Sequence, residues 1–262
     1  MTRVSLVGRG AVVTGGGRGI GASVARALAA EGSAVVVAAR TTREIEAVAD
    51  ELRGGGAKAW AVACDVTDEA SVQDLGREAR RFLGTVDVLI NNAGDSHSAP
   101  LRKMALADWE RMFAVNATGT FLCTREFAPE MAGRGWGRIV NVASVAGLEG
   151  AKYVAAYSAA KHAVLGFTRS VALEFAGTGV TVNAVCPGYV DTPMTERTLA
   201  NVGALADLPR EEALKAVLAS AGQDRLVSAE EVASAVVDLC AVGSQLTGQS
   251  ILLKSGGSVR AR

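Results

Sequence analysis

A tyrosine and a lysine lie four residues apart in the segment "YSAAKHAVLGFTRSVALE", at Tyr157 and Lys161. If the segment is helical, residues at i and i+4 share one face, so the phenol and the ammonium are neighbours. Free tyrosine has a pKa of about 10, and a nearby cation stabilises phenolate and lowers that pKa. Such a phenol can donate a proton to a carbonyl or accept one from an alcohol. The same spacing also arises by chance on solvated helices, so the pair needs support from elsewhere in the chain.

Ser144 and a glycine-rich turn give that support. Ser144 ends the apolar run "GRIVNVAS", thirteen residues before Tyr157, and its hydroxyl can donate a hydrogen bond to the same substrate oxygen. The turn "TGGGRGIG" occupies 14–21, after one apolar run and before an amphipathic stretch. Glycines let the backbone turn tightly and approach a pyrophosphate, which a helix N-terminus attracts. The alternative is a purely structural turn, which its place between a strand and a helix disfavours.

The elements that must position these residues alternate along the chain. Short apolar runs rich in Val and Ile predict strands at 10–15, 34–40, 59–66, 86–94, 137–144, 180–188 and 250–257. Amphipathic stretches between them predict helices at 22–32, 42–56, 68–84, 105–135 and 157–179. Apolar strands that alternate with helices are typical of a parallel sheet covered on both faces. We therefore expect one α/β domain over 1–262, a Rossmann-type doubly wound parallel sheet, with 189–225 as a small helical lid over the substrate.

Composition limits the function classes. The 262 residues include 27 basic and 27 acidic side chains, so nothing global favours nucleic acid or an anionic membrane. The four cysteines are widely spaced and form no CxxC pair, which favours buried thiols in a reducing cytoplasm over disulfides or a metal site. We find neither an apolar signal segment near the N-terminus nor an apolar run of about 20 residues, so we expect no membrane association.

Six motifs in order resemble the short-chain dehydrogenase/reductase family over essentially the whole chain. They are the TGxxxGxG spacing from Thr14, "NNAG" at 91–94, Asn116 in "AVNATG", Ser144, "YSAAK" at 157–161 and "PGYVDT" at 187–192. The resemblance implies a nicotinamide-dependent oxidoreductase without a metal. It implies that Tyr157 is the acid/base and Ser144 orients the substrate. Lys161 would lower the tyrosine pKa and bind ribose, and Asn116 would hold a water that relays protons to Lys161.

The resemblance also implies a set of cofactor contacts. They lie in the glycine turn, at the carboxyl ends of the second, third, fourth and sixth predicted strands, and on the Tyr157 helix. The set is Gly15, Arg18, Gly19, Ile20, Gly21, Arg40, Thr41, Asp65, Val66, Asn92, Ala93, Gly94, Tyr157, Lys161, Pro187, Gly188, Val190 and Thr192. The second strand ends in Ala39-Arg40, with no acid to bind a free ribose 2′-hydroxyl. Arg18 and Arg40 can bracket a 2′-phosphate, so we expect NADP(H), with NAD(H) possible; the alternative is that both arginines are solvated.

The sequence predicts the substrate contacts less clearly than the cofactor contacts. We expect the pocket to be formed by 95–101, 145–153 and the lid, with Ser144, Tyr157, His97 and Lys152 as candidate contacts, although such a histidine or lysine is more often a solvated loop residue. Local segments resemble aromatic polyketide ketoreductases, 3-hydroxybutyrate dehydrogenases and 3-oxoacyl-thioester reductases. These similarities favour reduction of a 3-oxoacyl thioester of CoA type or a related ketone. An NAD-dependent dehydrogenase of secondary alcohols or 3-hydroxy acids is an alternative.

Three departures from these relatives matter. "DSHS" replaces a Pro-Gly-Gly stretch of the polyketide enzymes, and Leu173 replaces an arginine that docks the acyl carrier, although Arg134 and Arg138 remain near that face. Lys254-Ser255 replaces the usual Val-Asp and could alter a subunit contact. A catalytically silent dinucleotide sensor is a second class of function, and a sugar-nucleotide epimerase is disfavoured by length. The family usually forms homotetramers through helices around 105–132 and 157–176, which we expect here.

Overall fold

The computed structural model describes residues 5–255 and 257–261, which form a single α/β domain around one eight-stranded sheet. The strand order is β3-β2-β1-β4-β5-β6-β7-β8, with the first seven strands parallel and β8 antiparallel to β7. The order reverses between β1 and β4, where doubly wound sheets bind ligands beyond the strand ends. The strands are β1 (Gly10–Thr14), β2 (Ala34–Ala39), β3 (Ala59–Ala63), β4 (Val88–Asn91), β5 (Gly137–Val142), β6 (Val180–Pro187), β7 (Ser250–Lys254) and β8 (Gly257–Ala261).

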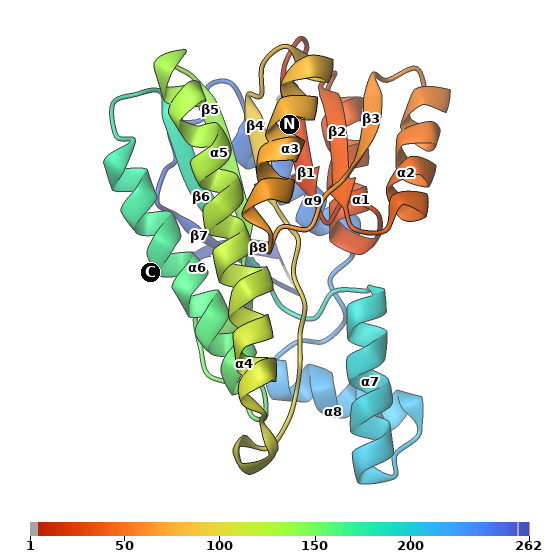
Figure 1. The fold of residues 1–262 in the computed structure, drawn as a ribbon. Helices are drawn as coiled ribbons and strands as arrows, with labels where there is room; N and C mark the ends of the chain where they lie inside the picture. Colours follow the sequence, from red (N-terminus) through yellow and green to blue (C-terminus); the bar gives the residue numbers. More distant parts are fainter. Residues whose placement is uncertain (1–4, 256, 262) are drawn as a thin grey trace.

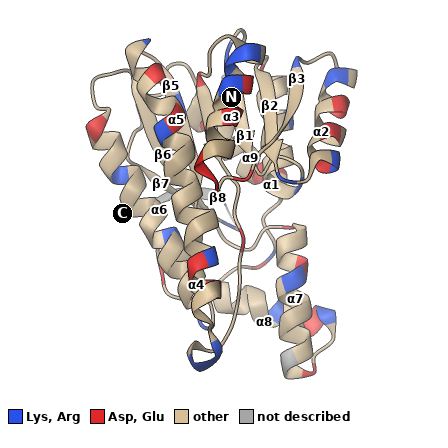
Figure 2. Ribbon diagram, in the orientation of Figure 1, with Lys and Arg blue, Asp and Glu red and all other residues tan. Residues whose placement is uncertain are grey.

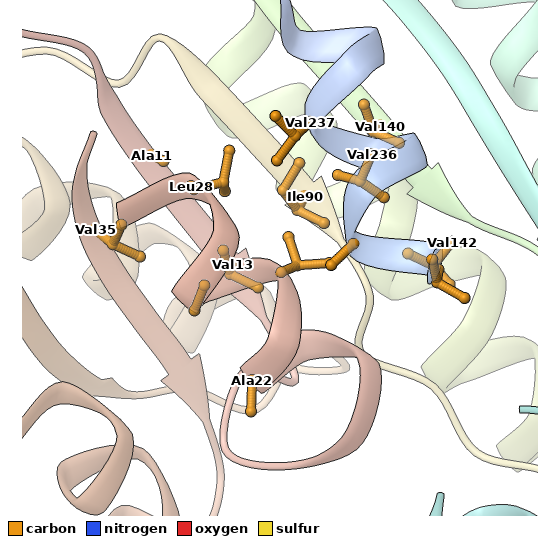
Figure 3. Packing of buried hydrophobic residues seen from close by; sticks show 14 of the residues in the cluster. Ala11, Val13, Ala22, Leu28, Val35, Ile90, Val140, Val142, Val236 and Val237 are labelled. Atoms are coloured by element: carbon orange, nitrogen blue, oxygen red, sulfur yellow. The ribbon is translucent and has the colours of Figure 1, made fainter. Parts of the chain in front are cut away.

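Helices cover both faces of the sheet, as the apolar strands require (Figure 1). One layer contains α1 (Gly19–Ala30), α2 (Thr42–Gly54) and α9 (Ala229–Cys240), and the other contains α3 (Glu69–Leu83), α5 (Gly119–Gly133) and α6 (Ala155–Glu174). Alternate residues of β1 point to opposite layers: Ala11 and Val13 join the first core and Val12 the second. Figure 3 shows Val13 of β1 in the first core, together with Val236 and Val237 of α9.

Charged residues of both signs are interspersed on α2, α3 and α7 (Figure 2). An anion must therefore be attracted by particular groups and not by these helices as a whole. No helix of the described residues is long and apolar enough to span a membrane, and no group of three metal-ligating side chains occurs among them. The prediction of buried thiols is confirmed, because Cys64, Cys123, Cys186 and Cys240 are all buried and unpaired in the described chain.

The long helix predicted over 105–135 is continuous over 106–133, but it contains a π-helical turn that its hydrophobic spacing did not indicate. The chain there forms α4 (Leu106–Phe113), a π-helical turn (Ala114–Thr118) and α5. Side chains in and next to the turn bond to backbone carbonyls of the helix: Asn116 Nδ2 donates to the Met112 carbonyl, and Thr120 Oγ1 of α5 donates to the Asn116 carbonyl. A π turn widens the helix locally and often marks a functional site. Hydrophobic spacing alone cannot reveal it, because both flanking segments remain helical.

The 189–225 segment forms α7 (Pro193–Ala206) and α8 (Arg210–Ala221), which lie beyond the strand ends, below the sheet in Figure 1. Thr192 caps α7 and Pro193 occupies its first turn, where a missing N–H costs nothing. The segment leaves and rejoins the body at a bridge between Val190 and Val227. The predicted last strand, 250–257, is too long, because the chain reverses after Lys254 and pairs back as β8.

Candidate active site

The glycine turn is packed tightly against the end of β4. Gly15 and Gly19 have φ values of +63° and +51°, in the left-handed region that favours glycine. A Cβ on Gly15 would lie 2.8 Å from the Cα of Ala93, and one on Gly21 would lie 2.3 Å from the Gly15 carbonyl oxygen. Asn92 Nδ2 donates to the carbonyls of Thr14 and Gly15, each at 3.0 Å. Predicted members of the cofactor set are thus brought together at the point where the strand order reverses.

The start of α1 leaves its first N–H groups available to a ligand. Arg18 occupies the N-cap position, and its side chain makes no capping hydrogen bond to the described first turn. Four N–H groups at a helix start lack intrahelical partners, and the helix dipole makes that end attractive to anions. Thr14 Oγ1 accepts hydrogen bonds from the backbone N–H groups of Asn92 and Ala93, each at 3.1 Å, which ties β1 to β4 beside this end.

Ser144, Tyr157 and Lys161 line one cavity of about 660 Å³. Ser144 follows β5 and caps a short 3-10 helix, with its Oγ accepting from the Ala146 N–H at 3.1 Å. Tyr157 and Lys161 share one face of α6, and Lys161 Nζ lies 5.7 Å from the centre of the Tyr157 ring. Lys161 Nζ also donates to the Val142 carbonyl at 2.8 Å, so the ammonium is held beneath the end of β5. The proximity predicted from spacing is present.

The protonation of this pair is controlled by burial. Burial raises the pKa of Tyr157 to about 12, although a hydrogen bond with Ser144 opposes the rise. Burial lowers the pKa of Lys161 to about 8. The role of Lys161 in lowering the tyrosine pKa stays a prediction, because in the protein alone burial of the phenol is the largest influence on that pKa. At neutral pH the phenol is protonated and can act as a proton donor.

Asn116 lies in the π turn beside Gly94 and Lys161. Its Nδ2 donates to the carbonyls of Asp95 and Met112, each at 2.9 Å, which fixes the amide. Its Oδ1 is buried and has no hydrogen-bond partner among the described residues. A Cβ on Gly94 would lie 2.8 Å from that oxygen and 3.6 Å from Lys161 Nζ. A buried unpaired acceptor needs a donor from a bound molecule.

The cavity contains about half of the predicted site residues. Those along its wall are Ile20, Asn92, Gly94, His97, Asn116, Ser144, Tyr157, Lys161, Pro187, Gly188, Val190 and Thr192. His97 Nε2 is 3.5 Å from Asp108 Oδ2. Lys152 is exposed and lies outside this wall, contrary to its proposed role. Sequence reasoning missed Arg197 of α7 and assigned Lys254 of β7 to a subunit contact, whereas both line the cavity.

The residues expected around the adenosine end form a second group, beyond β2 and β3. Arg18 Nη1 is 3.1 Å from Glu44 Oε1, and Arg40 Nη1 is 3.9 Å from Asp65 Oδ2. Thr41 lines a second hollow of about 620 Å³ there. Exposed ion pairs contribute only about 0–1 kcal/mol, so a phosphate can compete for both guanidinium groups. Val66 is buried against Gly119, where an added Cβ would lie 2.7 Å from Val66 Cγ2.

Two basic residues considered for acyl-carrier docking are not free surface groups. Arg138 is buried and donates to the carbonyls of Gly137, Gly179 and Val242, so its expected place on a docking face is wrong. The Arg134 side chain is 28% exposed and pairs with Glu130 at 2.6 Å. Both residues lie at the amino end of β5, away from the cavity. They stabilise the fold: Arg138 donates to backbone carbonyls, and Arg134 pairs with a carboxylate.

The family model described as short chain dehydrogenase matches residues 9–203. The chain belongs to the short-chain dehydrogenase family. Among its relatives, the 3-oxoacyl-acyl-carrier-protein reductase of Aquifex aeolicus is 36% identical over 255 residues, covering 97% of this chain and 98% of the relative. The D-beta-hydroxybutyrate dehydrogenase of Cupriavidus necator is 35% identical over 255 residues, covering 97% and 99%.

The structure of actinorhodin polyketide ketoreductase with NADPH is also similar. It superposes with a TM-score of 0.89 at 38% identity, covering 94% of this chain and 95% of the other. The predicted family and fold class are thereby confirmed, and the protein is an oxidoreductase.

Proposed function

We propose that this protein is an NADP(H)-dependent oxidoreductase that interconverts a ketone and a secondary alcohol, with Tyr157 as acid/base. The observation that carries the proposal is the convergence of Ser144, Tyr157 and Lys161 on one cavity that also reaches Ile20 of the glycine turn. A 3-oxoacyl thioester of CoA type, or a related ketone, is the proposed substrate class.

The residues present fit a dinucleotide. The glycine turn leaves no room for a Cβ at Gly15 or Gly21, and the start of α1 offers uncapped N–H groups to a pyrophosphate. The nicotinamide end would be held by Pro187, Gly188, Val190 and Thr192, and the ribose by Tyr157 and Lys161. When bound, the nicotinamide supplies or accepts hydride.

The chain's own residues perform the proton chemistry. Tyr157, protonated at neutral pH, donates its proton to the carbonyl oxygen, and Ser144 Oγ holds that oxygen with a second hydrogen bond. Lys161, with a pKa lowered to about 8, can return a proton to the phenol near neutral pH. The unpaired Oδ1 of Asn116 orients the water that resupplies Lys161 from solvent. A protonated phenol is the form needed for ketone reduction, which supports the reductive assignment.

Preference for NADP(H) is supported by Arg18 and Arg40. The end of β2 carries no acid, and both guanidinium groups are exposed with only weak partners. A similar ketoreductase structure contains NADPH. NAD(H) use, as an alcohol or 3-hydroxy acid dehydrogenase, is the second candidate, and the hydroxybutyrate dehydrogenase relative is the observation that favours it. The cytoplasmic location, the homotetramer and the lid role of 189–225 stay predictions from family resemblance and pattern.

A thioester or free ketone is favoured over a carrier-bound acyl group. Leu173 is 79% exposed where the carrier-docking arginine would lie, and Arg138 is buried. The surface of this protein therefore lacks two of the cations that would attract the acidic surface of a carrier protein.

The test is a panel of ketones and acyl thioesters, followed at the nicotinamide absorbance with NADPH and with NADH. We expect Tyr157→Phe to lower turnover by at least about a hundred-fold while NADPH still binds, because the proton donor is lost and Lys161 remains to hold the ribose. Tyr153→Phe is the control, since Tyr153 is exposed and lies outside the cavity wall. NADPH binding without turnover of any compound would favour a silent sensor instead.

A further inference from the structure

A lysine from the last parallel strand enters the cavity on the side away from the glycine turn. Lys254 ends β7 and lines the same cavity as Ser144 and Tyr157. It is half-buried, and no carboxylate of residues 5–255 and 257–261 lies within 4.0 Å of its ammonium. Nor does its side chain make a hydrogen bond within that described part of the chain. A half-buried cation on the wall of a substrate cavity is a ready partner for an anion.

The surrounding structure holds this lysine in place. Gly188 donates its N–H to the Leu253 carbonyl at 2.9 Å, and Ser255 Oγ accepts from the Asp224 N–H at 2.9 Å. These bonds join the end of β7 both to the nicotinamide-side loop and to the segment after α8. The last residues of α8, Ser220 and Ala221, line the cavity too, and a helix carbonyl end favours a cation beside it. Lys254 is thus part of the cavity wall, and Ser255 beside it ties the strand end to the segment after α8.

The other charged groups on the cavity wall have identified roles or places. Lys161 is tied to the Val142 carbonyl and to the tyrosine chemistry. Arg197 of α7 pairs with Asp95 at 3.4 Å. Glu149 is exposed, on the loop after the 3-10 helix that Ser144 caps. Lys254 is therefore the cation of this wall that is left without a partner among the described residues.

Resting on the function proposed above, we propose that Lys254 determines specificity by binding an anionic group of the substrate, a carboxylate or its equivalent, remote from the reacting ketone. Ser144 follows β5, whereas Lys254 ends β7, two strands away. Neighbouring strands lie about 4.8 Å apart, so the two backbones are separated by about 10 Å. The four-carbon lysine stem spans part of that gap. The favoured substrates are oxo acids whose anion lies several bonds from the ketone carbon.

The experiment compares acids with their neutral esters. Levulinate and its one- and two-carbon-longer homologues are titrated into NADPH-loaded Tyr157→Phe, alongside their methyl esters, and binding is measured by calorimetry. Wild-type kcat/KM is measured for the same compounds. We expect at least one acid to bind and react about ten-fold better than its ester, as a charge-assisted hydrogen bond allows.

Lys254→Met keeps the volume of the side chain and removes its charge. The acid-over-ester ratio should fall about ten-fold through KM, while ester turnover and NADPH affinity stay the same; Lys254→Arg should restore the ratio in part. Lys215→Met is the matched control, because Lys215 is exposed on α8 and lies outside the cavity wall. An unchanged ratio in Lys254→Met, a loss of NADPH affinity in its place, or no acid preference at any spacing overturns the proposal. Loss of ester turnover in Tyr157→Phe tests the proposed function separately.

Discussion

The tightest contact of the glycine turn gives a sharp test of the dinucleotide site. In Gly21→Ala, the added methyl would lie 2.3 Å from the Gly15 carbonyl oxygen and 2.4 Å from Asn92 Nδ2. Neither atom can retreat freely, because the same Asn92 amide donates to the carbonyls of Thr14 and Gly15. The substitution must therefore move the turn away from the end of β4, or move Asn92 away from both carbonyls.

The expected cost combines three effects. Overpacking costs about 1–3 kcal/mol, and loss of two hydrogen bonds costs about 1 kcal/mol each. Better helix propensity of alanine returns up to about 1 kcal/mol. The free energy of unfolding should thus fall by about 2–4 kcal/mol. Because displacement of the turn also moves the N–H groups that face a pyrophosphate, NADPH affinity should fall at least about ten-fold.

Urea unfolding and NADPH fluorescence titration measure the two effects. Gly166→Ala is the matched control: Gly166 lies inside α6, and its added Cβ would meet no described atom within 4 Å. That control should gain about 0.5–1 kcal/mol from propensity and keep its NADPH affinity. If Gly21→Ala matches wild type in both urea midpoint and NADPH affinity, the close approach of residue 21 to Gly15 and Asn92 does not require glycine.

Two further changes test the charges of the site. Arg40→Asp places an acid at the end of β2, so the NADPH/NADH ratio of kcat/KM should fall by at least about ten-fold. An unchanged ratio removes Arg40 from cofactor selection. Arg77→Asp is the control, because Arg77 is exposed on α3 and lines neither hollow. Lys161→Met should lower turnover by orders of magnitude, and near-normal turnover would refute its role. In the wild type, the folded-state pKa of Lys161 is about 8, below its ordinary 10.5. Between these two pKa values the lysine of the unfolded chain binds more protons than Lys161 of the folded chain. The contribution of Lys161 therefore makes the free energy of unfolding rise with pH in that range, by up to about 3 kcal/mol. Lys161→Met should flatten the rise in urea unfolding between pH 7 and 9.5, and an identical slope in both proteins would contradict the burial argument.

Most of the fold could be predicted because its signals are local. Each parallel strand is a short apolar run, and Gly32, with φ of +91°, ends α1 where the sequence places a stop. Two features that the sequence did not indicate have long-range partners. The π turn around Asn116 depends on the Asp95 carbonyl, which is distant in sequence. β8 exists because it pairs with β7, and its own residues carry no strong strand pattern.

The cofactor half of the site could be predicted from the sequence, whereas most of the substrate half could not. The cofactor half is made of backbone turns that only glycine allows, so spacing alone indicated it. The substrate half is assembled from side chains on distant elements: His97 follows β4, Arg197 lies on α7 and Lys254 ends β7, yet all three line one cavity. No period or spacing connects those positions. The departure at Lys254 was visible in the sequence, but its direction into the cavity was not.

The Tyr157–Lys161 pair shows why proximity alone does not decide charge. Spacing on α6 places Lys161 next to the phenol, and that prediction is correct. The same packing that brings the groups together also removes both from water, which raises the tyrosine pKa and lowers that of the lysine. The two pKa values move apart, so near neutral pH the phenol is neutral, Lys161 is still mostly protonated, and the lysine can pass a proton to a phenolate formed on Tyr157. The phenol is thus poised to donate at neutral pH, and its use as a base in alcohol oxidation requires alkaline pH or an added positive charge in the cavity.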